Sequence, residues 1–160
     1  MSELGIVPFQ RIGAISNSHV GREFEAAIAG AFKAQGYHVR QQFRIPVGFG
    51  KTKKDRVFDF GSDDPKLLIE CKSHRWTTGG NNPSAKMTVW TEAMFFFHLA
   101  PSDYRKCLCV LRDVHAKRGV SLAEHYVRNH THLIPPGVEI LEFDAEQNIL
   151  KTVYHAEVLA

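Results

Sequence analysis

The residues with the clearest potential for chemistry lie in the stretch 57–72, which contains Asp59, Glu70 and Lys72. Two short apolar runs there flank a polar turn with a proline, a pattern that predicts a β-hairpin. Side chains alternate along a strand, so a loop at residues 63–66 would place Asp59 directly across from Glu70, with Lys72 two residues further along the same face. The same alternation puts Phe58 and Phe60 together on the opposite, apolar face.

Two facing carboxylates repel each other unless a cation lies between them. Clustered carboxylate oxygens suit Mg²⁺ or Mn²⁺, and a neighbouring lysine can hold a water or a phosphate oxygen beside the metal. The alternative is a surface hairpin whose polar face simply meets solvent, which is the usual explanation for an isolated Asp near a Glu-x-Lys. Leu68 shares the face of Glu70 and argues against a solvated face.

Length and composition predict an ordinary globular protein. A chain of 160 residues, 44% hydrophobic and 23% charged, is expected to form one domain over residues 1–160, with its core at about 18–143. It has no apolar run of transmembrane length and no pattern of a secretory signal, so the cytoplasm is the expected location. The cysteines lie in apolar runs without metal-site or disulfide spacing and are expected to be buried thiols: Cys71, Cys107 and Cys109.

Positive charge is concentrated just before the hairpin, where six basic residues and one acid lie between Arg40 and Arg56. A solvated loop is the common explanation for such a block, but next to a metal centre it suits contacts with a phosphate backbone. Pro46 is expected to end the preceding strand, and residues 47–50 to form a flexible loop. The expected nucleic-acid contacts are Arg40, Arg44, Lys51, Lys53, Lys54, Arg56 and Arg75.

The first expected helix is capped by Asn17 or Ser18 and ends at Gly36. Its buried stripe consists of Val20, Phe24, Ala27, Ile28, Ala31 and Phe32. Glu23 and Glu25 lie on opposite borders of this stripe, each about 100° from its axis, so periodicity alone cannot decide which of them faces a site at the edge of the core.

The remaining pattern predicts a strand at 37–45, the hairpin, an apolar helix at 85–99 capped by Ser84, and an interior strand at 106–112. A helix at 121–130, a strand at 138–143 and an edge strand at 149–158 follow. The order indicates an α/β sandwich with a mixed sheet.

This arrangement resembles the PD-(D/E)xK nuclease superfamily, which has the restriction-endonuclease-like fold. Residues 21–25 followed by residues 36–39 are similar to the opening of its Mrr-like branch, and the archaeal Holliday-junction resolvases have a comparable layout. The similarity covers about residues 18–112. Phe58 departs from the pattern because a proline often precedes the aspartate.

The resemblance implies a three-layer sandwich, with a central mixed sheet flanked by helices, that acts as a Mg²⁺-dependent DNA endonuclease. It implies that Asp59 and Glu70 hold the metal, that Lys72 orients or activates the attacking water, and that Glu25, rather than Glu23, assists the metal through a water. A homodimer or higher homo-oligomer is expected, because one centre cuts one strand.

Two other functions stay open, since a fold does not determine function. The chain could be a nucleic-acid-binding module that does not cut. It could also be a structural or assembly subunit that uses the apolar helix at 85–99 as its interaction surface.

Overall fold

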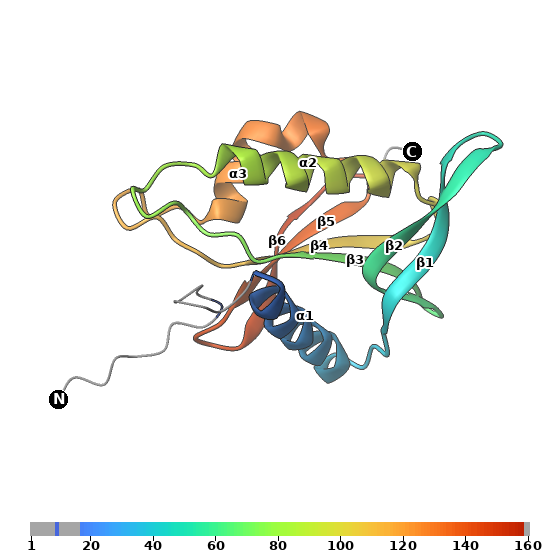
Figure 1. Cartoon of the computed structure of the whole chain (residues 1–160), viewed down its shortest axis with the longest axis horizontal. Helices are drawn as coiled ribbons and strands as arrows, with labels where there is room; N and C mark the ends of the chain where they lie inside the picture. The colour runs from blue at the N-terminus through green and yellow to red at the C-terminus, as the bar shows by residue number, and fades with distance from the viewer. Residues whose placement is uncertain (1–8, 10–16, 159–160) are drawn as a thin grey trace.

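The computed structural model describes residue 9 and residues 17–158, and this part of the chain forms a six-stranded mixed sheet with helices on both faces (Figure 1). The predicted order of helices and strands is confirmed. The elements are α1 (Asn17–Ala34), β1 (Arg40–Phe49), β2 (Thr52–Asp63), β3 (Lys66–Lys72), α2 (Ser84–Leu99), β4 (Arg105–Leu111), α3 (Leu122–His130), the 3₁₀ turn η1 (Thr131–Leu133), β5 (Val138–Asp144) and β6 (Ile149–His155).

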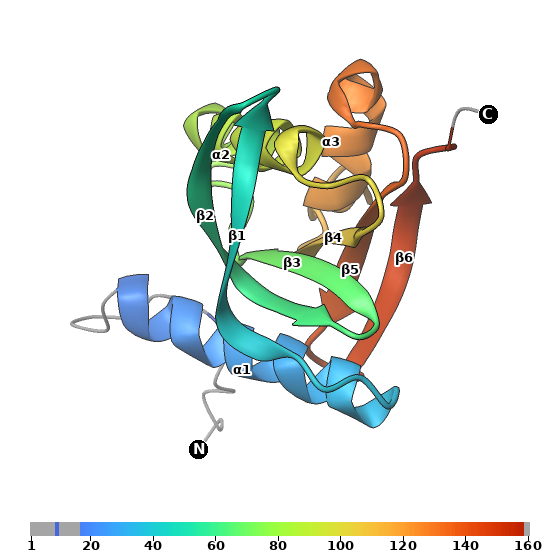
Figure 2. The same cartoon turned by 90° about the vertical axis from the view of Figure 1, so that its right-hand side faces the viewer.

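The strands lie in the sheet in their chain order, from β1 at one edge to β6 at the other. The central strands β3, β4 and β5 are parallel, and the three remaining neighbour pairs are antiparallel. Parallel neighbours need crossover connections, which α2 and α3 supply. Both helices lie on one face of the sheet and α1 lies on the other (Figures 1 and 2).

Each face of the sheet has its own hydrophobic core. Trp90 and Phe97 of α2 and Tyr126 of α3 are fully buried on one face. Phe24, Ile28 and Phe32 of the predicted α1 stripe belong to the other core, and Val20 of the same stripe is also fully buried. Every residue of β4 from Lys106 to Leu111 is buried, so its prediction as an interior strand is confirmed.

The ends of the helices follow the sequence signals in part. Gly36 has a left-handed φ of +90° just after α1, and Tyr37 N–H donates to Phe32 O at 3.0 Å, which closes the helix as predicted. The prediction that Ser84 caps α2 is wrong: Ser84 is the first helical residue, and Pro83 at the cap position makes no side-chain hydrogen bond to the helix.

The prediction of a flexible loop after Pro46 is also wrong. β1 continues through Pro46 to Phe49, and β2 begins at Thr52, so a tight turn joins the two strands. Proline is compatible with this position because β1 is an edge strand and can leave one side of its backbone without a partner. The turn between β2 and β3 is likewise tighter than predicted, since Asp63 pairs with Lys66.

The prediction that Phe58 and Phe60 share one face is wrong as well. Phe60 packs in the core under α1, whereas Phe58 stacks on Phe97 of α2, with ring centroids 5.6 Å apart. The register pairs Phe43 with Phe58 and leaves Gln42, with a left-handed φ of +50°, across from Asp59. The left-handed backbone of Gln42 fits a bend in β1 and β2 at this point. Beyond the bend, the two strands run towards α2.

Among the described residues, no helix has both the length and the apolar character needed to cross a membrane.

Candidate functional site

The candidate site lies where β2 and β3 stop pairing. The ladder runs from Asp63–Lys66 to Phe60–Ile69 and ends one residue short of the expected pair of Asp59 and Glu70. Asp59 Oδ2 instead accepts a hydrogen bond from the backbone N–H of Cys71 at 2.7 Å. The aspartate side chain therefore satisfies a strand donor that would otherwise lose its partner.

Glu70 is the most buried carboxylate of the site, with only 3% of its side chain exposed. Burial, and then the charge of Asp59, raise the pKa of Glu70 to about 7. Lys72 Nζ lies 3.7 Å from Glu70 Oε2, and an Arg56 nitrogen lies 3.3 Å from Glu70 Oε1. These two cations compensate the buried charge only in part.

Helix α1 brings Glu25, and not Glu23, to this group. Glu25 is half-buried, and burial followed by the charge of Asp59 raises its pKa, while Lys72 and Arg22 act in the opposite direction. Glu23 is exposed and pairs with His19 at 3.0 Å. Two residues that periodicity could not distinguish therefore have different surroundings in the fold.

A cavity of about 280 Å³ opens beside Glu25 and Asp59. It is lined by Arg22, Glu25, Gln41, Gln42, Val57, Phe58 and Asp59. Sequence reasoning missed Arg22, Gln41 and Gln42. Arg22 precedes Glu25 by three residues and so shares its side of the helix, a signal that could have identified it. The left-handed backbone of Gln42 has no such signal.

The carboxylates of the site have the chemistry of ligands for a divalent cation. In the described part of the chain, no group of three or more His, Cys, Asp or Glu side chains has the arrangement of a metal site. Mg²⁺, however, commonly uses only one or two protein carboxylates and keeps waters or phosphate oxygens as its other ligands. Asp59 and Glu70 are such a pair of hard oxygen donors, and burial together with the charge of Asp59 raises the pKa of Glu70 despite the nearby Lys72 and Arg56. Their chemistry fits this ion.

The predicted nucleic-acid residues divide into two groups. Arg44, Lys51, Lys53 and Lys54 are exposed on β1, β2 and the turn between them. The other three are engaged within the fold: Arg40 pairs with Asp63 at 2.7 Å, Arg56 contacts Glu70, and Arg75 pairs with Asp113 at 3.2 Å.

Arg56 has a role that sequence reasoning did not identify. Its guanidinium lies 4.0 Å from the centroid of the Phe96 ring on α2 while it contacts Glu70. This packing holds the guanidinium in one orientation, so Arg56 contacts Glu70 from within the fold. An arginine in a basic block is indistinguishable by sequence from its solvated neighbours.

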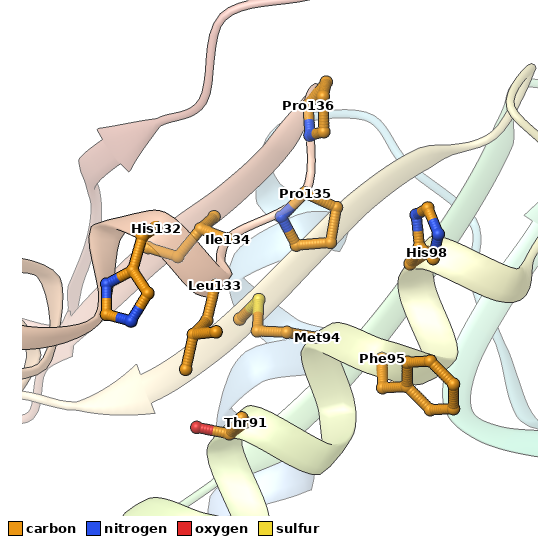
Figure 3. A pocket seen from close by; sticks show the side chains of 9 residues that line it. All are labelled: Thr91, Met94, Phe95, His98, His132, Leu133, Ile134, Pro135 and Pro136. Carbon is orange, nitrogen blue, oxygen red and sulfur yellow. The ribbon is translucent and has the colours of Figure 1, made fainter.

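An apolar groove lies elsewhere, between α2 and the segment after α3 (Figure 3). Its cavity of about 350 Å³ is lined by Thr91, Met94, Phe95, His98, His132, Leu133, Ile134, Pro135 and Pro136. None of the candidate site residues lines it. The groove shows that α2 is not covered on all sides, and Phe95 remains 52% exposed.

No family model matches the sequence, and the search of curated proteins finds no match.

Proposed function

We propose that this chain is a Mg²⁺-dependent DNA endonuclease with a restriction-endonuclease-like three-layer sandwich. The observation that carries the proposal is the meeting of Glu25, Asp59, Glu70 and Lys72, from three different elements, around an under-compensated buried carboxylate. The placement of α1 on one face of the mixed sheet, and of α2 and α3 on the other, supports the proposed layers (Figure 2).

In this proposal Asp59 and Glu70 hold the metal, and Glu25 reaches it through a water. Mg²⁺, with Mn²⁺ as a substitute, would supply positive charge next to the phosphate and lower the pKa of a bound water. The Cys71 N–H orients Asp59 through its hydrogen bond, and Arg56 restrains Glu70 from the other side. Both acids are thus held by neighbours before any ligand arrives.

Lys72 completes the proposed site. Its ammonium lies 3.7 Å from Glu70 and is half-buried, so it can hold an attacking water or donate to a non-bridging phosphate oxygen as negative charge develops there. Lysine suits this role because it is a compact charge with three donors. Arg22, at the cavity beside Glu25, is positioned to meet a second phosphate oxygen.

The proposed partner is DNA, and the proposed assembly is a homodimer, since two single-strand centres are required to cut both strands of a duplex. The free thiols of Cys71, Cys107 and Cys109 are compatible with the reducing cytoplasm that we propose as its location.

The decisive test is incubation of the purified chain with supercoiled, linear, single-stranded and branched DNA, in Mg²⁺, in Mn²⁺ and in EDTA. We expect metal-dependent cleavage that Lys72→Ala and Glu70→Gln abolish, with DNA binding retained within a few fold. Lys86→Ala and Glu92→Gln are the matched controls, because both residues are exposed on α2. Cleavage by Lys72→Ala at the wild-type rate would refute the proposal.

A second candidate, a DNA-binding module that does not cut, is favoured by one observation. Arg56 and Lys72 already contact Glu70, so the fold can hold this carboxylate without a metal. A mobility shift with DNA, without a metal-dependent product and without stabilisation by Mg²⁺, would identify this function instead.

A further inference from the structure

Strands β1 and β2 extend together beyond the rest of the sheet. β3 pairs with β2 only over residues 60–63, so within the described ranges residues 43–58 pair only with one another. This part, here called the ribbon, bends alongside α2 (Figure 2). Ile45 and Val47 on its inner side pack into the core with α2, and Arg56 lies over Phe96, so the helix supports the ribbon.

Two aromatic rings remain exposed where the end of the ribbon meets α2. Phe49 is 64% exposed and Phe95 is 52% exposed, and their ring centroids lie 6.2 Å apart. Figure 3 shows Phe95 on the α2 side of the apolar groove. Rings of this size are normally buried. A single exposed ring is common on protein surfaces, but an adjacent pair indicates a binding surface.

The same end of the molecule is positively charged. Arg44, Lys51, Lys53 and Lys54 are all exposed, and Asp55 is the one acid among residues 43–58. Within the part of the chain described, none of these four cations forms an ion pair, although Lys53 Nζ donates a hydrogen bond to Gly48 O at 3.3 Å. The complementary ligand is a polyanion that also offers flat apolar surfaces.

We propose that the ribbon binds the unpaired, single-stranded part of a DNA substrate, with a base stacked on the Phe49/Phe95 pair and phosphates on the surrounding cations. This combination of exposed rings and a positive surface is the one that recognises single strands. Within a duplex each base face is already covered by its neighbours, so the cations would bind a duplex but the rings would have nothing to stack on. The proposal rests on the proposed function, because it assigns a substrate class to the same site.

Arg56 connects the ribbon with that site, because it lies on β2, the strand that begins directly after the turn and also carries Asp59. Arg56 follows Thr52 by four positions, which corresponds to about 13 Å of strand. At about 3.4 Å per nucleotide of a stacked strand, this distance spans roughly four nucleotides. Cleavage is therefore expected a few nucleotides from the unpaired base held by the rings.

The test measures binding by the full chain in EDTA, where no cleavage occurs. Fluorescence anisotropy compares a labelled single strand, a blunt duplex of the same sequence, and a fork that joins the two. We expect tighter binding of the single strand and of the fork than of the duplex. Phe49→Leu keeps apolar bulk but loses the ring, and should weaken single-strand binding at least about fivefold, with duplex binding unchanged. Phe95→Leu should act in the same direction.

Lys53→Ala is the matched control. It should weaken binding of single strand and duplex by the same factor and reduce the salt slope by about one, because it removes a phosphate contact and no stacking surface. Phe49, Phe95 and Lys53 are all exposed, so thermal unfolding of each variant should coincide with that of the wild type.

Equal single-strand affinity of the wild type and Phe49→Leu would overturn the inference. A wild-type dimer that Phe49→Ser dissociates, with DNA affinity unchanged, would also overturn it and assign the rings to self-association. Failure of the proposed function gives a different result. If binding in EDTA depends on the rings but the protein does not cleave DNA in Mg²⁺, this inference stands and only the nuclease proposal is refuted.

Discussion

Replacing Glu70 by glutamine should stabilise the metal-free protein, and the gain should grow with pH. The buried carboxylate has a pKa raised from 4.5 to about 7, so the folded state holds a proton that the unfolded state releases. Stability then falls as pH rises from about 4.5 to 7, because the unfolded state binds fewer protons than the native state over this range. Glutamine keeps the shape and the hydrogen-bonding oxygen but cannot ionise.

The size of the effect follows from the shift in pKa. A difference of one pKa unit corresponds to about 1.4 kcal/mol, so the full penalty of ionised Glu70 is about 3 kcal/mol. Most of this penalty, roughly 2 kcal/mol or more, develops between pH 5 and pH 8. The free energy of unfolding of Glu70→Gln, minus that of the wild type, should therefore rise by this amount over the same range.

Urea unfolding in EDTA at pH 5, 6, 7 and 8 measures this difference. The matched control is Glu92→Gln, an exposed carboxylate on α2, which should follow the wild-type curve at every pH. A difference between Glu70→Gln and the wild type that stays constant from pH 5 to pH 8 would refute the reasoning, since it would mean that Glu70 carries no burial penalty when ionised.

Three further predictions concern the metal, the helix acid and the packing of β2. Millimolar Mg²⁺ at pH 8 should raise the thermal midpoint of the wild type but not that of Asp59→Asn; equal shifts would place the ion elsewhere. Glu25→Gln should slow Mg²⁺-dependent cleavage roughly 10- to 100-fold, whereas Glu23→Gln should not, and similar rates for both would contradict the assignment. Gly61→Ala should cost about 1–3 kcal/mol in urea unfolding, because a Cβ there would overlap the ring of Phe43.

Gly30→Ala is the control for the last prediction. Gly30 lies on α1 with open space around its would-be Cβ, so alanine should stabilise the helix by about 0.5–1 kcal/mol. Destabilisation by both substitutions to a similar degree would show that close packing against Phe43 is not the reason for the glycine at position 61.

Local pattern in the sequence determined the elements and much of their order. The buried stripe of α1, the apolar run of β4 and the order of the strands were all predicted correctly, because each depends on the spacing of apolar residues within one element. Alternation within β3 likewise placed Glu70 and Lys72 on one side, and the structure brings their charges to 3.7 Å. These features require no knowledge of what lies opposite.

The tertiary structure alone decided how separate elements meet. Glu23 and Glu25 are equivalent by periodicity, and only the direction in which α1 crosses the sheet brings Glu25 to Asp59. The left-handed Gln42, the early end of the β2–β3 ladder and the inward turn of Arg56 each depend on long-range packing. Sequence spacing records which side of its own element a residue occupies, but the distances between elements arise only when the two cores of the sheet are assembled.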